Sequence, residues 1–268
     1  MYLSTGLNTE LKMHALTLNQ IHTSLQHPAM HGMSFLNEIM DRYPQAISFA
    51  PGAPHARTLE GFDPAACMAR YQDYLRDELG LNDAQITKRL YQYGPARGVI
   101  NELLAGALLL DQQIRVRPRD LVVTVGAQEG MLLVLRAVCR DKRDLVAMVN
   151  PSFVGIRGAA CLLDIPTLPV PETANGQELD GEILAQLCIA ARRRGERVRA
   201  LYVAPDFSNP SGTLMSLAAR HQILQLAKEH DFLILEDNAY GFTADNGGML
   251  PTLKALDQSR PSPTGRVI

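Results

Sequence analysis

Short apolar runs alternate with helical segments through the middle of this chain, and the alternation constrains the fold more than any other feature. The runs are rich in Val, Leu and Ile, which is typical of buried strands. The segments between them carry apolar residues at helical spacing. Strands are expected over 121–125, 144–150, 165–170, 198–205 and 231–237. This order predicts an α/β fold with a mostly parallel sheet and helices on both faces.

The helices of this pattern can be placed from the same periodicity. Asp63 and Pro64 match the N-cap and first position of a helix that ends before Gly80. Upstream of the strands, helices are expected over 31–43, 63–80 and 99–113, and a short strand over 46–56. Between the strands, helices are expected over 127–140, 152–164, 179–194 and 217–230.

Composition excludes several classes of function. The formal net charge of −2 gives no surface suited to a polyanion. The run Arg192–Arg194 falls at the end of an expected helix, where cations complement the dipole, so a solvated surface is favoured over nucleic-acid binding. No apolar run approaches the roughly 20 residues of a membrane span, and the N-terminus lacks the order of a signal peptide.

Cysteine and histidine spacing favours no metal centre. The four cysteines are far apart, which indicates reduced thiols in a cytoplasmic protein. Four histidines lie near the N-terminus and could in principle hold a metal, but Pro28 breaks helical pairing of the last two, so a solvated arm is favoured. They are His14, His22, His27 and His31.

Residues that follow the expected strands are the candidates for function, because ligands of such sheets bind beyond the carboxyl ends of the strands. Gly126, Ala127 and Gln128 open a helix after the first strand, where unpaired N–H groups suit a phosphate. A tight strand-to-helix turn explains the glycine equally well. Phe153 offers an aromatic ring, although core packing is the ordinary role of such a residue.

Two further strand ends carry polar side chains. Asn209 precedes Pro210, which restricts its backbone to extended conformations, although a simple turn has the same composition. Asp237 needs a cation or a hydrogen-bond donor, which a protonated pyridine nitrogen would provide. Its neighbour Glu236 should point to the opposite face and share no site with it.

Taken together, these residues describe a site for pyridoxal 5′-phosphate. They combine a phosphate cradle, an aromatic ring for stacking, an Asn and Tyr240 for the ring hydroxyl, and an Asp for the ring nitrogen. A nicotinamide fold is disfavoured because no GxGxxG follows a strand.

Five motifs resemble the fold type I, aspartate aminotransferase-like, class I/II aminotransferases. They occur in the family's order and span most of the chain; the set is specific, although no single motif is. The stretch 33–55 is most similar to the branch of dihydroxyphenylglycine transaminase and related natural-product aminotransferases. The motifs are YQYGPARGVINEL (91–103), VTVGAQEGMLLVLRA (123–137), VNPSFVG (149–155), APDFSNPSGT (204–213) and LILEDNAYGF (233–242).

The resemblance implies roles for individual residues. It implies that the phosphate lies on residues 126–128, that Phe153 stacks on the pyridine ring, and that Asn209 and Tyr240 hold the ring hydroxyl. By the same resemblance, Asp237 binds the ring nitrogen. Tyr93 looks like the tyrosine that reaches the partner subunit's phosphate in family homodimers, and Gly52 like the glycine beside the substrate.

The resemblance also implies two domains and an incomplete catalytic set. Residues 1–58 correspond to an N-terminal arm and part of a small domain, and 59–268 to a large cofactor-binding domain that is incomplete at its C-terminus. The lysine that binds the cofactor covalently in the family is expected just beyond Ile268. Lys254 sits in an expected surface turn and is a poor candidate for that role.

Three functions therefore stay open. The first is a cytoplasmic aminotransferase acting on an amino acid and a 2-oxo acid. The second is another pyridoxal-phosphate reaction on the same fold, such as decarboxylation, elimination or oxidation. The third is a non-catalytic remnant that binds cofactor weakly or not at all.

Overall fold

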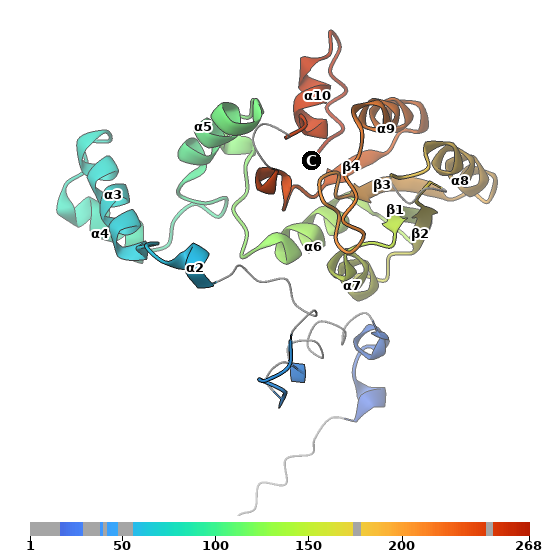
Figure 1. The fold of residues 1–268 in the computed structure, drawn as a ribbon, viewed down its shortest axis with the longest axis horizontal. Helices are drawn as coiled ribbons and strands as arrows, with labels where there is room; N and C mark the ends of the chain where they lie inside the picture. Colours follow the sequence, from blue (N-terminus) through green and yellow to red (C-terminus); the bar gives the residue numbers. More distant parts are fainter. Residues whose placement is uncertain (1–16, 29–37, 40–41, 48–55, 174–177, 245–248) are drawn as a thin grey trace, which may run out of the picture.

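A parallel β-sheet with helices on both faces forms the centre of the molecule (Figure 1). The computed structural model describes residues 17–28, 38–39, 42–47, 56–173, 178–244 and 249–268. The sheet has the order β2-β1-β3-β4. Its strands are β1 (Asp144–Asn150), β2 (Thr167–Pro171), β3 (Arg197–Val203) and β4 (Leu233–Glu236). The α/β fold expected from the alternation is confirmed.

Strand β1 lies inside the sheet and pairs in parallel with both β2 and β3. All of its residues except Asn150 are buried, as a strand covered on both faces requires. At the other side, β3 pairs with β4. Val267 continues the sheet beyond β4 through a parallel bridge to Ile234.

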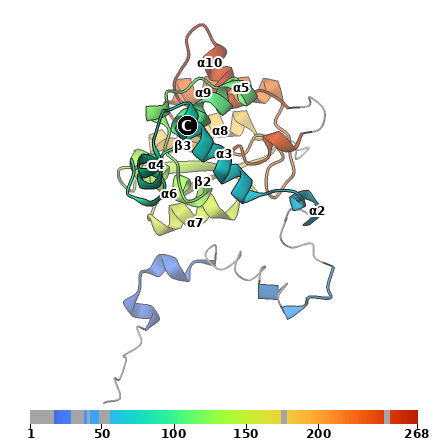
Figure 2. The same ribbon diagram turned by 90° about the vertical axis from the view of Figure 1, so that its left-hand side faces the viewer.

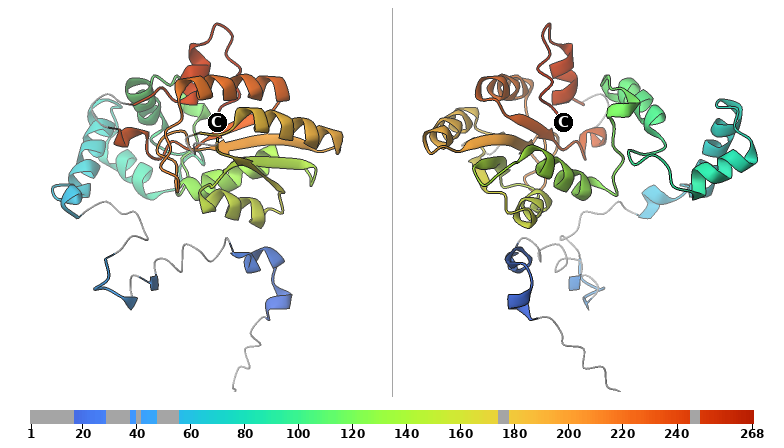
Figure 3. Two further views of the ribbon diagram at one scale, coloured as in Figure 1. Left: turned by 45° about the vertical axis from the view of Figure 1, so that its right-hand side comes forward. Right: turned by 180° about the vertical axis from the view of Figure 1, so that it is seen from behind.

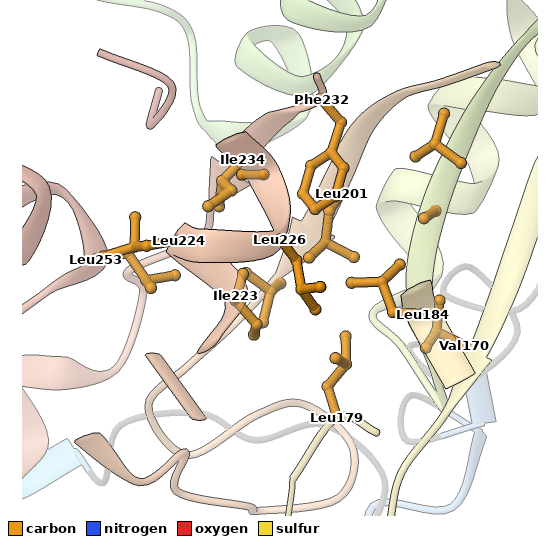
Figure 4. Packing of buried hydrophobic residues seen from close by; sticks show 14 of the residues in the cluster. Val170, Leu179, Leu184, Leu201, Ile223, Leu224, Leu226, Phe232, Ile234 and Leu253 are labelled. Carbon is orange, nitrogen blue, oxygen red and sulfur yellow. The ribbon is translucent and has the colours of Figure 1, made fainter. Parts of the chain in front are cut away.

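Helices cover the two faces unequally (Figure 3). One face carries α6 (Ala127–Val138) and α7 (Val154–Leu162). The other carries α8 (Gly181–Arg193), α9 (Leu217–His230) and α10 (Leu253–Ser259). Figure 4 shows the packing on this second face, where Leu184 of α8 and Ile223 of α9 pack over Leu201 of β3. The expected bounds of α9 agree with the structure at both ends.

The expected strand at 121–125 is absent, which corrects the sequence prediction. Its residues are suited to a strand, but Val122 is 57% and Val125 95% exposed. A strand needs a neighbour with free backbone groups, and the edge of β4 is already taken by 266–268. A cleft of about 800 Å³ lies between the two segments, with Val122 on one wall and Ile268 on another. The segment is held instead by a bond from Val123 N to Arg97 O at 2.7 Å.

Between residues 56 and 112 the chain forms α2 (Ala56–Leu59), α3 (Pro64–Asp77), α4 (Asp83–Tyr91) and α5 (Asn101–Gln112). Asp63 caps α3 as expected, since its carboxylate accepts from Ala65 N and Ala66 N. Helices α3 and α4 project away from the sheet, as Figures 1 and 3 show, and Figure 2 shows the same region facing the viewer.

Short 3-10 helices complete the described structure: η1 (Leu18–Gln20), η2 (Thr23–Gln26), η4 (Pro118–Asp120) and η5 (Gly241–Thr243). The expected helix at 31–43 and strand at 46–56 fall largely outside the described residues. Within the part of the chain that is described, no helix combines the length and apolar character needed to cross a membrane.

Candidate functional site

The carboxyl ends of β1, β3 and β4 meet at one edge of the sheet, because the three strands are parallel. The segments that follow them carry Phe153, Asn209 and Asp237. The structure thus places three of the expected site residues after neighbouring strands of one sheet.

Asp237 is fixed from two directions. Its backbone N–H donates to Val203 O at 2.9 Å, which extends the pairing of β4 with β3 by one residue. Its Oδ2 accepts a hydrogen bond of 2.6 Å from the Tyr202 hydroxyl. Tyr202 is 2% exposed and lies in the apolar layer between the sheet and α6–α7. The carboxylate of Asp237 is therefore held on the α6–α7 side of the sheet edge.

The Tyr202 hydroxyl acts as a donor. Burial raises the pKa of Tyr202 far above its usual range, and the bond to Asp237 raises it further. The phenol therefore stays protonated at any physiological pH.

Glu236 faces the other side of the sheet, as the alternation along a strand predicts. Its carboxylate accepts from Leu253 N at 2.7 Å and from Lys254 N at 2.9 Å, and so caps α10. Burial raises the pKa of Glu236, although these two bonds oppose the rise. The adjacent carboxylates thus serve separate purposes.

A buried ion pair holds the loop after β3. Arg220 of α9 is fully buried and donates to Asp206 Oδ1 at 2.6 Å. The same guanidinium donates to Pro251 O at 2.9 Å and to Met215 O at 3.2 Å. A buried charge requires such partners. Through them Arg220 ties α9 to the loop that carries Asn209, whose peptide bond to Pro210 is cis.

The start of α6 has the form of an anion site. Gly126 is its N-cap with φ of +107°, a conformation that favours glycine. The backbone N–H groups of Ala127 and Gln128 donate to no acceptor among the described residues. The Glu129 carboxylate accepts from Val125 N at 2.6 Å and does not pair with the N–H groups of Ala127 and Gln128.

Gly155 lets two expected site residues meet. A Cβ on Gly155 would collide with the Gln128 side chain and with the ring of Phe153. Gln128 comes from α6 and Phe153 caps α7, so the two side chains lie together against the same glycine. The phosphate candidate and the stacking candidate are therefore neighbours.

Other expected residues are less constrained. Asn209 and Tyr240 are exposed and have no side-chain hydrogen bond within the described part of the chain. Tyr93 is fully exposed. Gly52 lies outside the described residues. Lys254 donates from Nζ to Val267 O at 2.5 Å, so its amine is directed to the end of the chain and not to Asp237.

Sequence reasoning missed Tyr202 and the Arg220–Asp206 pair. In VRALYVAP, Tyr202 stands among the apolar residues of an expected strand. Strand alternation alone puts Asp237 on the same face as Leu235, but that Leu235 shares its face with Tyr202 follows only from the structure. Nothing local in AARHQILQ distinguishes Arg220 from a surface arginine.

Comparison with known proteins agrees with this architecture. The model of the aminotransferase class I and II family matches residues 66–259. The (S)-3,5-dihydroxyphenylglycine transaminase of Amycolatopsis orientalis is 44% identical over 256 residues, which cover 96% of this chain and 56% of the relative.

Solved structures match as well. An archaeal alanine:glyoxylate aminotransferase superposes with a TM-score of 0.72 and 27% identity, over 93% of this chain and 58% of that one. A kynurenine aminotransferase of Pyrococcus horikoshii, in complex with PMP, superposes with a TM-score of 0.68 and 25% identity. The match covers 87% of this chain and 54% of that one. The chain spans somewhat more than half the length of these relatives.

The fold is that of the fold type I aminotransferases. The chain belongs to the aminotransferase class I and II family, as the five motifs predicted.

Proposed function

We propose that this chain supplies the cofactor-binding part of a pyridoxal-phosphate-dependent aminotransferase, which moves an amino group between an amino acid and a 2-oxo acid. The observation that carries the proposal is the Asp237 carboxylate, held by Tyr202 at the carboxyl edge of the sheet. A fixed carboxylate at this edge suits a cationic ring nitrogen. The similarity to a transaminase at 44% identity supports the same class of reaction.

The residues present fit the cofactor. The N–H groups of Ala127 and Gln128 offer unpaired donors and the positive end of a helix to a phosphate. Oδ1 of Asp237 accepts no hydrogen bond from a described residue and is available to a ring N–H. Ser152 Oγ, beside Phe153, is buried without a partner among the described residues, so one more donor or acceptor lies near the site.

Each side chain would have one task toward the bound group. Phe153 would pack against the ring, and Asn209 and Tyr240 would bond its hydroxyl. Asp237 would hold a proton on the ring nitrogen. When bound, the cofactor supplies an electron-accepting ring that stabilises negative charge formed on the substrate.

The homodimer expected from the resemblance belongs to the same proposal. Tyr93 is fully exposed, and we propose that it meets the phosphate bound by a partner subunit. Sedimentation at several protein concentrations tests the dimer. A monomer at every concentration that binds cofactor normally would remove this role of Tyr93.

Three further assignments belong to the same proposal. We propose the division into residues 1–58 and 59–268 on the ground of the resemblance to the family, and because the sheet and the helices that cover it all lie within the second range. We propose that Gly52 lies beside the substrate. A cytoplasmic location is proposed because all four cysteines are free thiols.

The function is tested on protein isolated from its native source. Borohydride reduction followed by intact-mass measurement should show a phosphopyridoxyl adduct. Unreduced protein is then given nitrogen-15 amino acids together with unlabelled 2-oxo acids. Transfer of the label into new amino acids is expected. Release of labelled ammonia or of carbon dioxide, without transfer, would contradict an aminotransferase and favour another reaction on this fold.

A further inference from the structure

The Tyr202 hydroxyl is a polar group in a place where packing alone does not require one. The ring fills the layer between the sheet and α6–α7, beside Met148, Ile156 and Leu235. Phenylalanine would fill the same space. Burying a hydroxyl is costly unless it is hydrogen-bonded, and Asp237 is the partner that the structure provides.

The two carboxylate oxygens of Asp237 differ in their hydrogen bonding. Oδ2 receives the Tyr202 hydroxyl at 2.6 Å, whereas Oδ1 accepts from no described residue. The backbone bond from Asp237 N to Val203 O fixes the Cα of the same residue. The free oxygen therefore has one orientation relative to the sheet edge.

Hydrogen bonds donated to a carboxylate stabilise its ionised form and lower its affinity for a proton. A carboxylate and a pyridine nitrogen that share one proton compete for it. A donor on Oδ2 thus moves the shared proton toward the nitrogen. The buried phenol, which keeps its proton, is suited to this task.

We propose that Tyr202 is a positioning residue, which holds Asp237 so that Oδ1 meets the ring nitrogen of the cofactor and the shared proton stays on that nitrogen. The inference rests on the proposed function, since it concerns the same cofactor. It adds a residue that acts through Asp237 without touching the ring itself.

The test measures the protonation of the ring nitrogen directly. Pyridoxamine 5′-phosphate labelled with nitrogen-15 in the ring is bound to the 268-residue chain, and its chemical shift, which separates pyridine from pyridinium, is recorded. The wild-type chain should show pyridinium. Tyr202→Phe should shift the signal toward neutral pyridine and weaken binding about tenfold, the effect of roughly one pKa unit. Tyr43→Phe, which removes a hydroxyl from a tyrosine that is 62% exposed, should change neither.

The outcomes separate the two proposals. A wild-type chain that does not bind the ligand would overturn the proposed function together with this inference. Binding with an unchanged nitrogen signal in Tyr202→Phe would overturn the inference alone, because a merely structural role lowers stability without moving that signal. If Tyr202→Phe fails to fold, 3-fluorotyrosine at position 202 keeps the ring and strengthens the donor. At a pH where the wild-type signal lies between pyridine and pyridinium, the signal of this variant should move further toward pyridinium, and a shift the other way or none would refute the role.

Discussion

Tyr202 and Asp237 are 35 residues apart in the sequence, yet their side chains are joined by a hydrogen bond of 2.6 Å. Two neighbouring strands bring them together: Tyr202 lies one residue before the end of β3, and Asp237 follows the last residue of β4. The bond fixes the Asp237 carboxylate at the carboxyl edge of the sheet.

Asp237→Asn should weaken binding of pyridoxamine 5′-phosphate by about tenfold or more, because a charge-assisted bond to the ring nitrogen becomes a neutral one. Affinity for inorganic phosphate should not change, since the start of α6 is intact. Calorimetric titration of both ligands checks this. Asp83→Asn, at an exposed carboxylate, is the matched control. Equal affinity of Asp237→Asn and wild type for the pyridoxamine ligand would argue against a ring at this edge.

Two glycines of one segment should respond in opposite directions to alanine. Gly126→Ala should lower the free energy of unfolding by about 1–3 kcal/mol, because φ of +107° suits glycine alone, and it should weaken phosphate binding. Gly130→Ala lies inside α6, where the new Cβ would be 3.7 Å from Thr124 Oγ1. It should raise stability by about 0.5–1 kcal/mol. Urea unfolding measures both variants, and the same sign for the two would refute this description of the helix start.

Breaking the buried ion pair should be costly. Arg220→Met leaves the Asp206 carboxylate buried without its cation, and we expect a loss of about 3–5 kcal/mol in the free energy of unfolding. Asp206→Asn should be destabilising as well, and the double variant should cost less than the sum of the two. Arg194→Met, in an exposed pair with Glu196, should cost less than about 1 kcal/mol. Additive effects of Arg220→Met and Asp206→Asn would show that the pair is not coupled.

Glu236 should give the protein a measurable dependence of stability on pH. Burial raises its pKa above the ordinary 4.5, so the folded state holds the proton longer than the unfolded state as pH rises. The contribution of Glu236 to the free energy of unfolding is fully present below the unfolded-state pKa of about 4.5, and it is lost as pH rises through the higher pKa of the folded state. Glutamine at position 236 does not ionise, so Glu236→Gln does not lose stability in this way as pH rises.

The stability of Glu236→Gln relative to wild type should therefore improve as pH rises from about 4 to 7. The comparison needs unfolding free energies at several pH values. A constant difference between Glu236→Gln and wild type across this range would mean that the Glu236 pKa is not raised.

Much of the fold could be predicted because periodicity and caps are local signals. Asp63 caps α3, and α9 begins and ends where its apolar spacing does. The edge that carries Phe153, Asn209 and Asp237 followed from strand order alone, since parallel strands bring their carboxyl ends together.

The remainder depends on contacts that local sequence does not encode. The segment 121–125 has strand-forming residues, but pairing needs a neighbour and the described chain offers none there. The partner of Tyr202 becomes apparent only when the register of β3 against β4 is known. Arg220 is fully buried because its guanidinium bonds to residues 205–206, to Met215 and to Pro251, and its own neighbours in sequence do not predict this.

The most direct measurement is a crystal structure of the chain with pyridoxamine 5′-phosphate. The account predicts the phosphate on the N–H groups of Ala127 and Gln128, and the ring nitrogen within hydrogen-bond distance of Asp237 Oδ1. A ligand bound elsewhere, or one whose ring nitrogen points away from Asp237, would contradict it.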